Sequence, residues 1–144
     1  RDLHSFPTRR SSDLVLTWHE EMHMSASTDV ARVEMDAKPD HGGQGKGQSP
    51  KELVLSGLAG CTGMDVIAIL KKMRALPATL KIEVEADQTT EHPKVFSRIH
   101  LRYIATGADR EKLEKAVNLS QNQYCGVSAM LAKTAEITHE IIVD

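Results

Sequence analysis

The two cysteines, Cys61 and Cys125, are the residues of this chain whose side chains are best suited to chemistry. Cys125 directly precedes a short predicted helix, where free backbone N–H groups and the helix dipole favour a thiolate. Cys61 lies inside a long predicted helix and would need a charged neighbour for the same effect. Physical chemistry alone therefore predicts that Cys125 is the more acidic thiol. For Cys61 the competing interpretation is an inert small hydrophobe, the more usual role of a lone helical cysteine.

Composition restricts where these thiols act. The chain has 144 residues and a net charge of −2, which suits one domain or one subunit of a small oligomer. This charge argues against nucleic acid or an anionic membrane as the main partner. We expect no secretory signal and no transmembrane helix, because no uninterrupted apolar run reaches about 18 residues. Two cysteines without a signal peptide predict reduced thiols in the cytoplasm rather than a structural disulfide.

Residues 49–74 are predicted to form the long helix that carries the first cysteine. Ser49 is a suitable N-cap, and Pro50 suits the first helical position, where no N–H is needed. Lys71 and Lys72 fall in the last turn, where cations interact favourably with the helix dipole. A helix of this length is expected to run through the centre of the fold.

Three glycines at three-residue spacing mark this helix: Gly57, Gly60 and Gly63. Each costs about 1 kcal/mol relative to alanine in a helix. Close approach of another backbone would explain them, for example the same helix of a second subunit, and a kink or frayed turn is the alternative. The surrounding stretch, residues 53–64, is uncharged and lacks one-face periodicity, which predicts burial on most sides.

The remaining segments alternate strand and helix patterns. In chain order we expect a β meander in 15–36, a glycine-rich loop in 37–48, the long helix, a hairpin of strands 80–90 and 95–106, helices in 109–122 and 127–133, and a closing strand in 136–143. Asp109 is the expected N-cap of the first of these helices. Strand runs separated by helices indicate an α+β fold rather than a parallel doubly wound sheet. The glycine-rich loop lacks the ending of a phosphate loop, so nucleotide binding is not expected.

The first 14 residues do not fit this pattern. The string RDLHSFPTRRSSDL shows no periodicity and resembles a translated sequencing-adapter artefact more than a targeting peptide. A mitochondrial presequence is the alternative. We therefore expect a non-native leader in residues 1–14 and a single domain in residues 15–144.

Two segments resemble the OsmC/Ohr family, the osmotically inducible and organic hydroperoxide resistance proteins. One runs from Pro50 to Cys61 and ends in Ala-Gly-Cys, and the other is Cys-Gly-Val-Ser at 125–128. The resemblance extends over residues 15–144 and matches both family cysteines. It implies an α+β, OsmC-like fold, with an N-terminal meander, a long central helix, a hairpin, and C-terminal helices and strand. It also implies an intertwined homodimer whose central helices pack together.

The resemblance further implies a role for each cysteine. Cys61 would be the peroxidatic nucleophile, which attacks the O–O bond of a hydroperoxide and becomes a sulfenic acid. Cys125 would resolve it as a disulfide, which a dithiol reductant (lipoylated proteins for the Ohr branch) reopens. Neither a cofactor nor a metal ion is implied. This assignment differs from the acidity argument, and we follow the family because access and neighbours also govern reactivity.

Charged residues depart from the family pattern. Active peroxidases use an arginine from the N-terminal β region and a glutamate directly after the helix proline. Here Lys51 follows Pro50, and the glutamate comes one place later as Glu52, a shift that turns a helical side chain by about 100°. Glu52 remains a candidate catalytic residue, whereas Arg32 cannot be matched to the family arginine. Positive charge could come instead from other basic residues, although each is also explained as a surface charge: Lys46, Lys51 or Arg102.

Two functional hypotheses follow. The first is a thiol-dependent peroxidase for organic hydroperoxides in stress defence, in which apolar neighbours of Cys61, among them Leu58, Met64 and Ile67, favour an alkyl or lipid peroxide over H₂O₂. The second is a non-catalytic dimer that binds a small apolar ligand or senses redox state. A metal site would need Cys61, Cys125 and a histidine, and no CxxC or HxxxH spacing supports one; the histidines considered are His23, His41 and His139.

Overall fold

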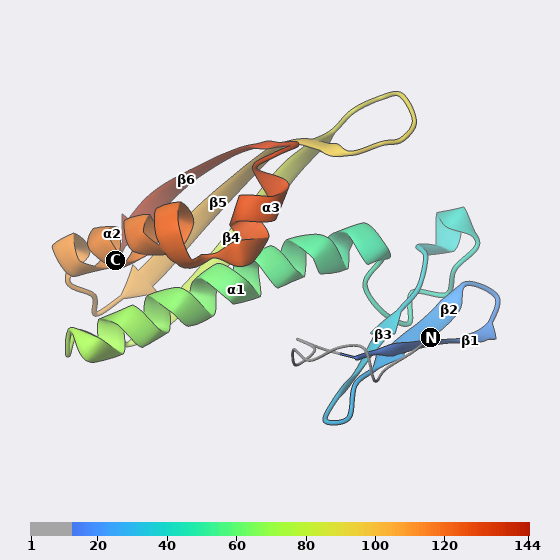
Figure 1. Cartoon of the computed structure of the whole chain (residues 1–144), viewed down its shortest axis with the longest axis horizontal. Helices are drawn as coiled ribbons and strands as arrows, with labels where there is room; N and C mark the ends of the chain where they lie inside the picture. Colours follow the sequence, from blue (N-terminus) through green and yellow to red (C-terminus); the bar gives the residue numbers. More distant parts are fainter. Residues whose placement is uncertain (1–12) are drawn as a thin grey trace, which may run out of the picture. The chain divides into compact units, whose positions relative to one another are not determined.

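The computed structural model describes residues 13–144, which form two compact units (Figure 1). One unit ends at Leu53 and the other runs from Val54 to Asp144. The predicted leader lies outside the described residues except for Asp13 and Leu14. The expectation of a single domain from residue 15 onward stays a prediction.

The first unit contains a three-stranded antiparallel sheet. Its strands are β1 (Val15–Glu20), β2 (His23–Ser27) and β3 (Arg32–Met35), in the spatial order β1-β2-β3. The predicted meander is therefore confirmed. Trp18 pairs with Met24 and Glu20 pairs with His23, so His19 is an extra residue in β1, a β-bulge.

The glycine-rich loop is organised by one buried carboxylate. The Asp36 side chain accepts hydrogen bonds from the backbone N–H groups of Ala37, Gln44 and Lys46, at 2.7 to 3.2 Å. A short 3₁₀ turn, η2 (Pro39–His41), lies within the loop. A Cβ at Gly43 would lie 1.7 Å from the backbone oxygen of Ala37, so only glycine permits this return of the chain.

The long helix α1 (Pro50–Lys72) begins at a capping box. The Ser49 N–H donates to Glu52 Oε1 at 2.9 Å, and the Glu52 N–H donates to Ser49 Oγ at 3.3 Å. Two of the N–H groups at the helix start are satisfied in this way. The predicted N-cap is therefore confirmed, and Glu52 is its reciprocal partner.

The second unit packs helices on one face of a mixed sheet (Figure 1). The sheet order is β4-β5-β6, with β4 and β5 antiparallel and β5 and β6 parallel. The elements after α1 are β4 (Thr79–Gln88), β5 (Phe96–Thr106), α2 (Arg110–Leu119), the π-helical turn η3 (Ser120–Tyr124), α3 (Gly126–Leu131) and β6 (Glu136–Val143). The Asp109 side chain caps α2 by accepting from the Lys112 N–H, as predicted.

The core of this unit lies between α1, α2 and β5. It is built from Leu58, Val66 and Leu70 of α1, Ile99, Leu101 and Tyr103 of β5, and Leu113, Ala116 and Val117 of α2. The buried residues of β5 alternate with charged residues on its other face, as expected of a strand with one covered face. This arrangement confirms the predicted α+β class.

The prediction that α1 is buried on most sides is wrong for the single chain. Its fully buried residues within the second unit recur every four positions, so they form one stripe: Leu58, Thr62, Val66 and Leu70. Met64 is 77% exposed. Apart from the adjacent residues and the nearby backbone of α1 itself, no described atom lies within 4 Å of the position of a Cβ at Gly57 or Gly60. The glycines of this exposed face are thus not explained by packing within the chain.

By length and composition alone, α1 is the one helix in the described part of the chain that could cross a membrane. Its most apolar 18-residue window has a mean hydropathy of 1.9, and 22% of that window is buried. No transmembrane helix is expected from the sequence when only an uninterrupted apolar run is sought. The helix α1 meets the hydropathy criterion for a membrane span once single polar residues within the window are allowed. A core helix of a globular protein passes the same criterion.

Candidate functional site

The fold of the second unit brings the two cysteines together. The sulfur atoms of Cys61 and Cys125 and the carboxylate of Asp65 lie within 4.8 Å of one another, and we name these three residues the thiol cluster. Cys61 and Asp65 are one turn apart on α1, and Cys125 lies between η3 and α3. Both cysteines are reduced; Cys61 is half-buried and Cys125 is buried.

The backbone around Cys125 fixes its side chain. The Cys125 N–H donates to the backbone oxygen of Ser120 at 2.7 Å, which closes the π-helical turn. The residue then becomes the N-cap of α3, and its sulfur accepts the Ser128 N–H at 3.3 Å. The predicted position of Cys125 just before a short helix is therefore confirmed.

The predicted acidity of Cys125 is wrong. Burial raises the pKa of its thiol to about 11, and although the Ser128 N–H opposes this shift, Cys61 and the charge of Asp65 add to it. A single hydrogen bond from a short helix does not offset desolvation and a nearby negative charge. Cys125 is thus held as a neutral thiol.

A buried chain of hydroxyl groups supports the thiol cluster. Thr62 Oγ1 lies 2.8 Å from both Tyr103 Oη and Ser120 Oγ, and Ser120 donates to Asp65 Oδ2 at 3.0 Å. Because Ser120 gives its only proton to the carboxylate, it must accept from Thr62, and Thr62 must in turn accept from Tyr103. The hydrogen bonds therefore run in one direction, from Tyr103 to Asp65.

Gln121 connects this chain to the helix that Cys125 caps. Its side-chain nitrogen donates to Thr62 Oγ1 and Tyr103 Oη, both at 3.1 Å. Its side-chain oxygen accepts from Ser128 Oγ at 2.8 Å. Burial raises the pKa of Tyr103, so its hydroxyl stays protonated as the start of the chain. The network holds α1, β5 and η3 in a fixed relation around the thiols.

The other predicted charged residues have identifiable partners elsewhere. Glu52 is engaged in the capping box with Ser49. Arg102 lies on the outer face of β5, where its guanidinium is 3.1 Å from Glu85 and 3.7 Å from Glu140. That face is opposite to the one carrying Tyr103, so the proposal that Arg102 supplies positive charge to the thiols is wrong.

Two further basic residues lie in the first unit. Lys46 forms an ion pair with Glu20 at 3.2 Å, and Arg32 pairs with Glu34. Lys51 is exposed in the first turn of α1. None of these observations assigns a basic residue to the thiols.

Within the second unit, no histidine joins Cys61 and Cys125 to complete the metal site considered from the sequence. Asp65 takes that position, while His139 packs edge-on against the Tyr103 ring, with ring centroids 6.0 Å apart. The sequence did offer a signal for Asp65, because it is the one charged residue between Leu53 and Leu70 and follows Cys61 by four positions.

An apolar groove runs along the exposed side of α1, between the helix and the start of β4. Its volume is about 730 Å³. We call Gly57, Gly60 and Gly63 the glycine ridge. Two of its members and neighbouring residues line the groove, including Gly60, Gly63, Met64, Ile67, Leu80 and Ile82. The groove is an unpaired apolar surface next to the helix that carries Cys61.

Comparison with known proteins identifies the family. The family model described as OsmC-like protein matches residues 43–140. Protein YhfA of Escherichia coli K12 is 38% identical over 96 residues, which cover 65% of this chain and 72% of the relative.

Solved structures share the fold of this chain. A hypothetical protein from Aquifex aeolicus superposes with a TM-score of 0.79 and 29% identity, over 94% of this chain and 99% of that one. The organic hydroperoxide resistance protein OhrB of Bacillus subtilis superposes with a TM-score of 0.67 over 92% of this chain and 98% of its own; at 18% identity this likeness concerns the fold alone. On the family match and these relatives, the chain belongs to the OsmC-like family.

Proposed function

We propose that the protein is a thiol-dependent peroxidase that reduces organic hydroperoxides through Cys61 and Cys125. The observation that carries the proposal is the meeting of the two sulfur atoms, from residues 64 positions apart, within the 4.8 Å thiol cluster. Organic hydroperoxide resistance proteins are among the solved structures that share this fold.

Cys61 is the nucleophile because it is the more accessible thiol. Its sulfur attacks the outer oxygen of ROOH, the O–O bond breaks, and the alkoxide leaves as ROH after taking a proton. Cys61 becomes a sulfenic acid. Cys125 then attacks that sulfur, which forms the disulfide and releases water. A dithiol reductant restores both thiols by exchange and becomes a cyclic disulfide itself.

Asp65 is the proposed proton acceptor during resolution. Cys125 must lose its proton as it attacks, and the raised pKa of its thiol means that the thiolate does not form in advance. The carboxylate of Asp65 lies within 4.8 Å of both sulfur atoms, and its orientation is set by Ser120. In the proposed step the proton passes to this carboxylate directly or through one water, as general-base catalysis requires.

The apolar groove beside α1 favours an alkyl substrate and a second copy of the chain. Met64 and Ile67 are exposed in the single chain and apolar. The alkyl group of an organic hydroperoxide gains free energy by burying its apolar surface there, whereas H₂O₂ has no such surface. The proposed partner is a second α1, whose approach the open glycines permit. The proposal places the homodimer in the cytoplasm, where dithiol reductants are available.

The test is stopped-flow oxidation of the reduced protein by cumene hydroperoxide and by H₂O₂, with loss of thiols as the readout. We expect rapid loss of two thiols, faster with the organic peroxide. Cys61→Ser should abolish it, and Cys125→Ser should stop the reaction at the sulfenic acid, which a dimedone-type probe captures. Oxidation of the wild type at the rate of a free thiol would refute the proposal.

Glu52→Gln separates a catalytic from a structural role of Glu52. Glutamine also completes a capping box, so this variant keeps the helix start and removes only the charge. A catalytic Glu52 predicts slower oxidation at unchanged stability. An unchanged oxidation rate would assign Glu52 to capping alone.

A second candidate function is a dimer that binds an apolar ligand or senses redox state. The neutral state of Cys125 and the negative charge of Asp65 favour it, because neither promotes thiolate formation. The stopped-flow rates identify a ligand-binding protein, since its thiols oxidise no faster than a free thiol. A redox sensor is recognised by rapid oxidation without repeated turnover when a dithiol reductant is supplied.

The dimer itself is tested by Gly60→Leu. No described atom lies within 4 Å of a Cβ at Gly60, so the single chain tolerates the larger side chain, whereas a helix packed against the ridge does not. Light scattering should show a shift from dimer to monomer. Val30→Glu, at an 88% exposed turn residue, is the control and should leave the dimer intact. A Gly60→Leu variant that remains a dimer would contradict packing through the ridge.

A further inference from the structure

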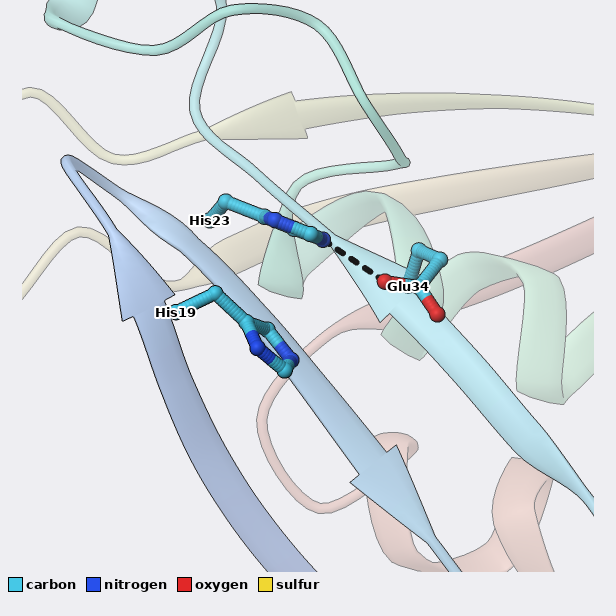
Figure 2. A group of neighbouring side chains, drawn as sticks. All are labelled: His19, His23 and Glu34. Atoms are coloured by element: carbon cyan, nitrogen blue, oxygen red, sulfur yellow. Dashed lines mark hydrogen bonds and ion pairs between the residues drawn. The ribbon is translucent and has the colours of Figure 1, made fainter.

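A second group of metal-binding side chains lies on the sheet of the first unit. The nitrogen atoms of His19 and His23 and a carboxylate oxygen of Glu34 lie within 4.8 Å of one another (Figure 2). We name these three residues the histidine cluster. They come from three different strands, β1, β2 and β3, so the whole sheet is needed to assemble them.

The register of the sheet explains why the three side chains meet. Ser25 pairs with Glu34, and His23 lies two positions from Ser25 on β2, so all three residues share one face. On the other side, β1 carries the bulge at His19. A bulge re-aims side chains next to a ladder, and here it places the His19 ring 4.7 Å from the His23 ring, measured between centroids.

The ligand atoms face one another, and each already takes part in a hydrogen bond. His19 Nε2 lies 3.3 Å from Arg32 Nη2. Because a guanidinium only donates, His19 Nε2 is the acceptor. The buried Ser25 hydroxyl lies 2.8 Å from the same nitrogen and orients it. His23 Nε2 lies 2.6 Å from Glu34 Oε1. A bound metal would displace the proton of this hydrogen bond and also the hydrogen bonds that His19 Nε2 accepts.

The cluster already holds a positive charge at its centre. The guanidinium of Arg32 contacts His19 Nε2 and both carboxylate oxygens of Glu34. The Arg32 side chain is 52% exposed, so it can turn outward into water when another cation takes its place.

We infer that His19, His23 and Glu34 bind one divalent transition-metal ion of the zinc class. Two imidazoles and one carboxylate suit such an ion and leave a fourth position open to water. In a tetrahedral site with bonds of about 2.0–2.1 Å, ligand atoms lie about 3.3 Å apart. The present separations, from 2.6 Å to at most 4.8 Å, bracket this value. Small side-chain rotations therefore complete the site.

The experiment titrates the full-length protein with Zn²⁺ in competition with a chromophoric zinc chelator. A Cys61→Ser/Cys125→Ser background removes the thiol cluster as a competing site. We expect one equivalent of bound zinc. His19→Gln and Glu34→Gln should each weaken binding at least tenfold, and the imidazole NMR signals of His19 and His23 should shift with zinc.

Two further variants make the test specific. Arg32→Gln removes the competing cation and should tighten binding several-fold. His100→Gln is the matched control, because His100 pairs with the Glu140 carboxylate at 2.8 Å on the other sheet, and it should leave the affinity unchanged. Circular dichroism checks that the variants fold. An absence of zinc binding would overturn the inference, as would binding that His19→Gln and Glu34→Gln leave unchanged.

Discussion

The thiol cluster and the histidine cluster place ionisable groups in opposite environments. In the second unit, burial raises the pKa of Cys125 to about 11 and keeps its thiol neutral. In the first unit, Arg32 and His23 lower the pKa of Glu34 to about 2 and keep it charged. The comparison teaches that desolvation dominates where side chains are enclosed, whereas direct charge partners dominate where water remains.

The two clusters also differ in what holds them in place. The thiols rest on a directed chain of buried hydroxyls from Tyr103 to Asp65, in which each group has a partner. The histidine cluster rests on ion pairs that join the partly buried His23 and the more exposed Arg32 to Glu34. Buried networks are costly to interrupt and exposed ion pairs contribute little to stability. The first cluster is therefore rigid, and the second can rearrange.

The largest expected effect comes from interrupting the buried chain. Thr62 is fully buried and bonds Tyr103, Ser120 and Gln121. Thr62→Val keeps the shape but leaves polar partners unsatisfied, and should lower the free energy of unfolding by about 2–3 kcal/mol. Urea denaturation measures it. The free energy of unfolding of the paired variant His19→Gln, at an exposed site, should stay within about 0.5 kcal/mol of the wild-type value. Equal losses in the two variants would break the comparison.

An intermediate effect is expected from removing the charge beside the thiols. Asp65→Asn can still accept from Ser120 but no longer repels a thiolate, so the pKa of Cys125 should fall. Burial remains, and the pKa should therefore stay above its usual range. In a Cys61→Ser background, alkylation of Cys125 by iodoacetamide at mildly alkaline pH should become about two- to tenfold faster. Identical rates in urea-unfolded protein are the control, and a slower folded-state reaction would contradict the proposed repulsion.

The smallest expected effect concerns acid stability at the histidine cluster. The pKa of Glu34 is lower in the folded state than its ordinary value of 4.5. Its contribution to stability is therefore complete above about pH 4.5 and is lost as the pH falls toward 2. Glu34→Gln lacks this contribution, so the stability difference between wild type and variant should shrink with falling pH. Urea denaturation of both proteins at a series of pH values, in the presence of a metal chelator, measures this difference. A difference that grows on acidification would show that the sign is wrong.

Much of the fold was predictable because its signals are local. Ser49 and Asp109 cap helices as their side chains allow, and β5 alternates buried and partly buried residues as its apolar and polar residues alternate. The spacing of the cysteines and the motif around each led to the OsmC-like family. These features depend on neighbours within a few positions, so one sequence contains them.

The candidate site was predictable only in part. The pairing of Cys61 with Cys125 was expected from the family, whereas Asp65 and the hydroxyl chain were not. The histidine cluster was missed altogether, because its members depend on a bulge at His19 and on the register between β2 and β3. Neither the bulge nor the register leaves a periodic signal in the sequence.

By itself the sequence determined the helices, the strands, their caps and the family to which the chain belongs. Only the tertiary structure decided which distant side chains meet and how charged they are. It placed Cys125 in a buried position beside Asp65, which reversed the acidity expected from the start of a helix. The physical reason is that capping and periodicity act over one or two turns of chain. Desolvation and charge–charge interactions instead depend on whatever the fold packs nearby, at any distance in sequence.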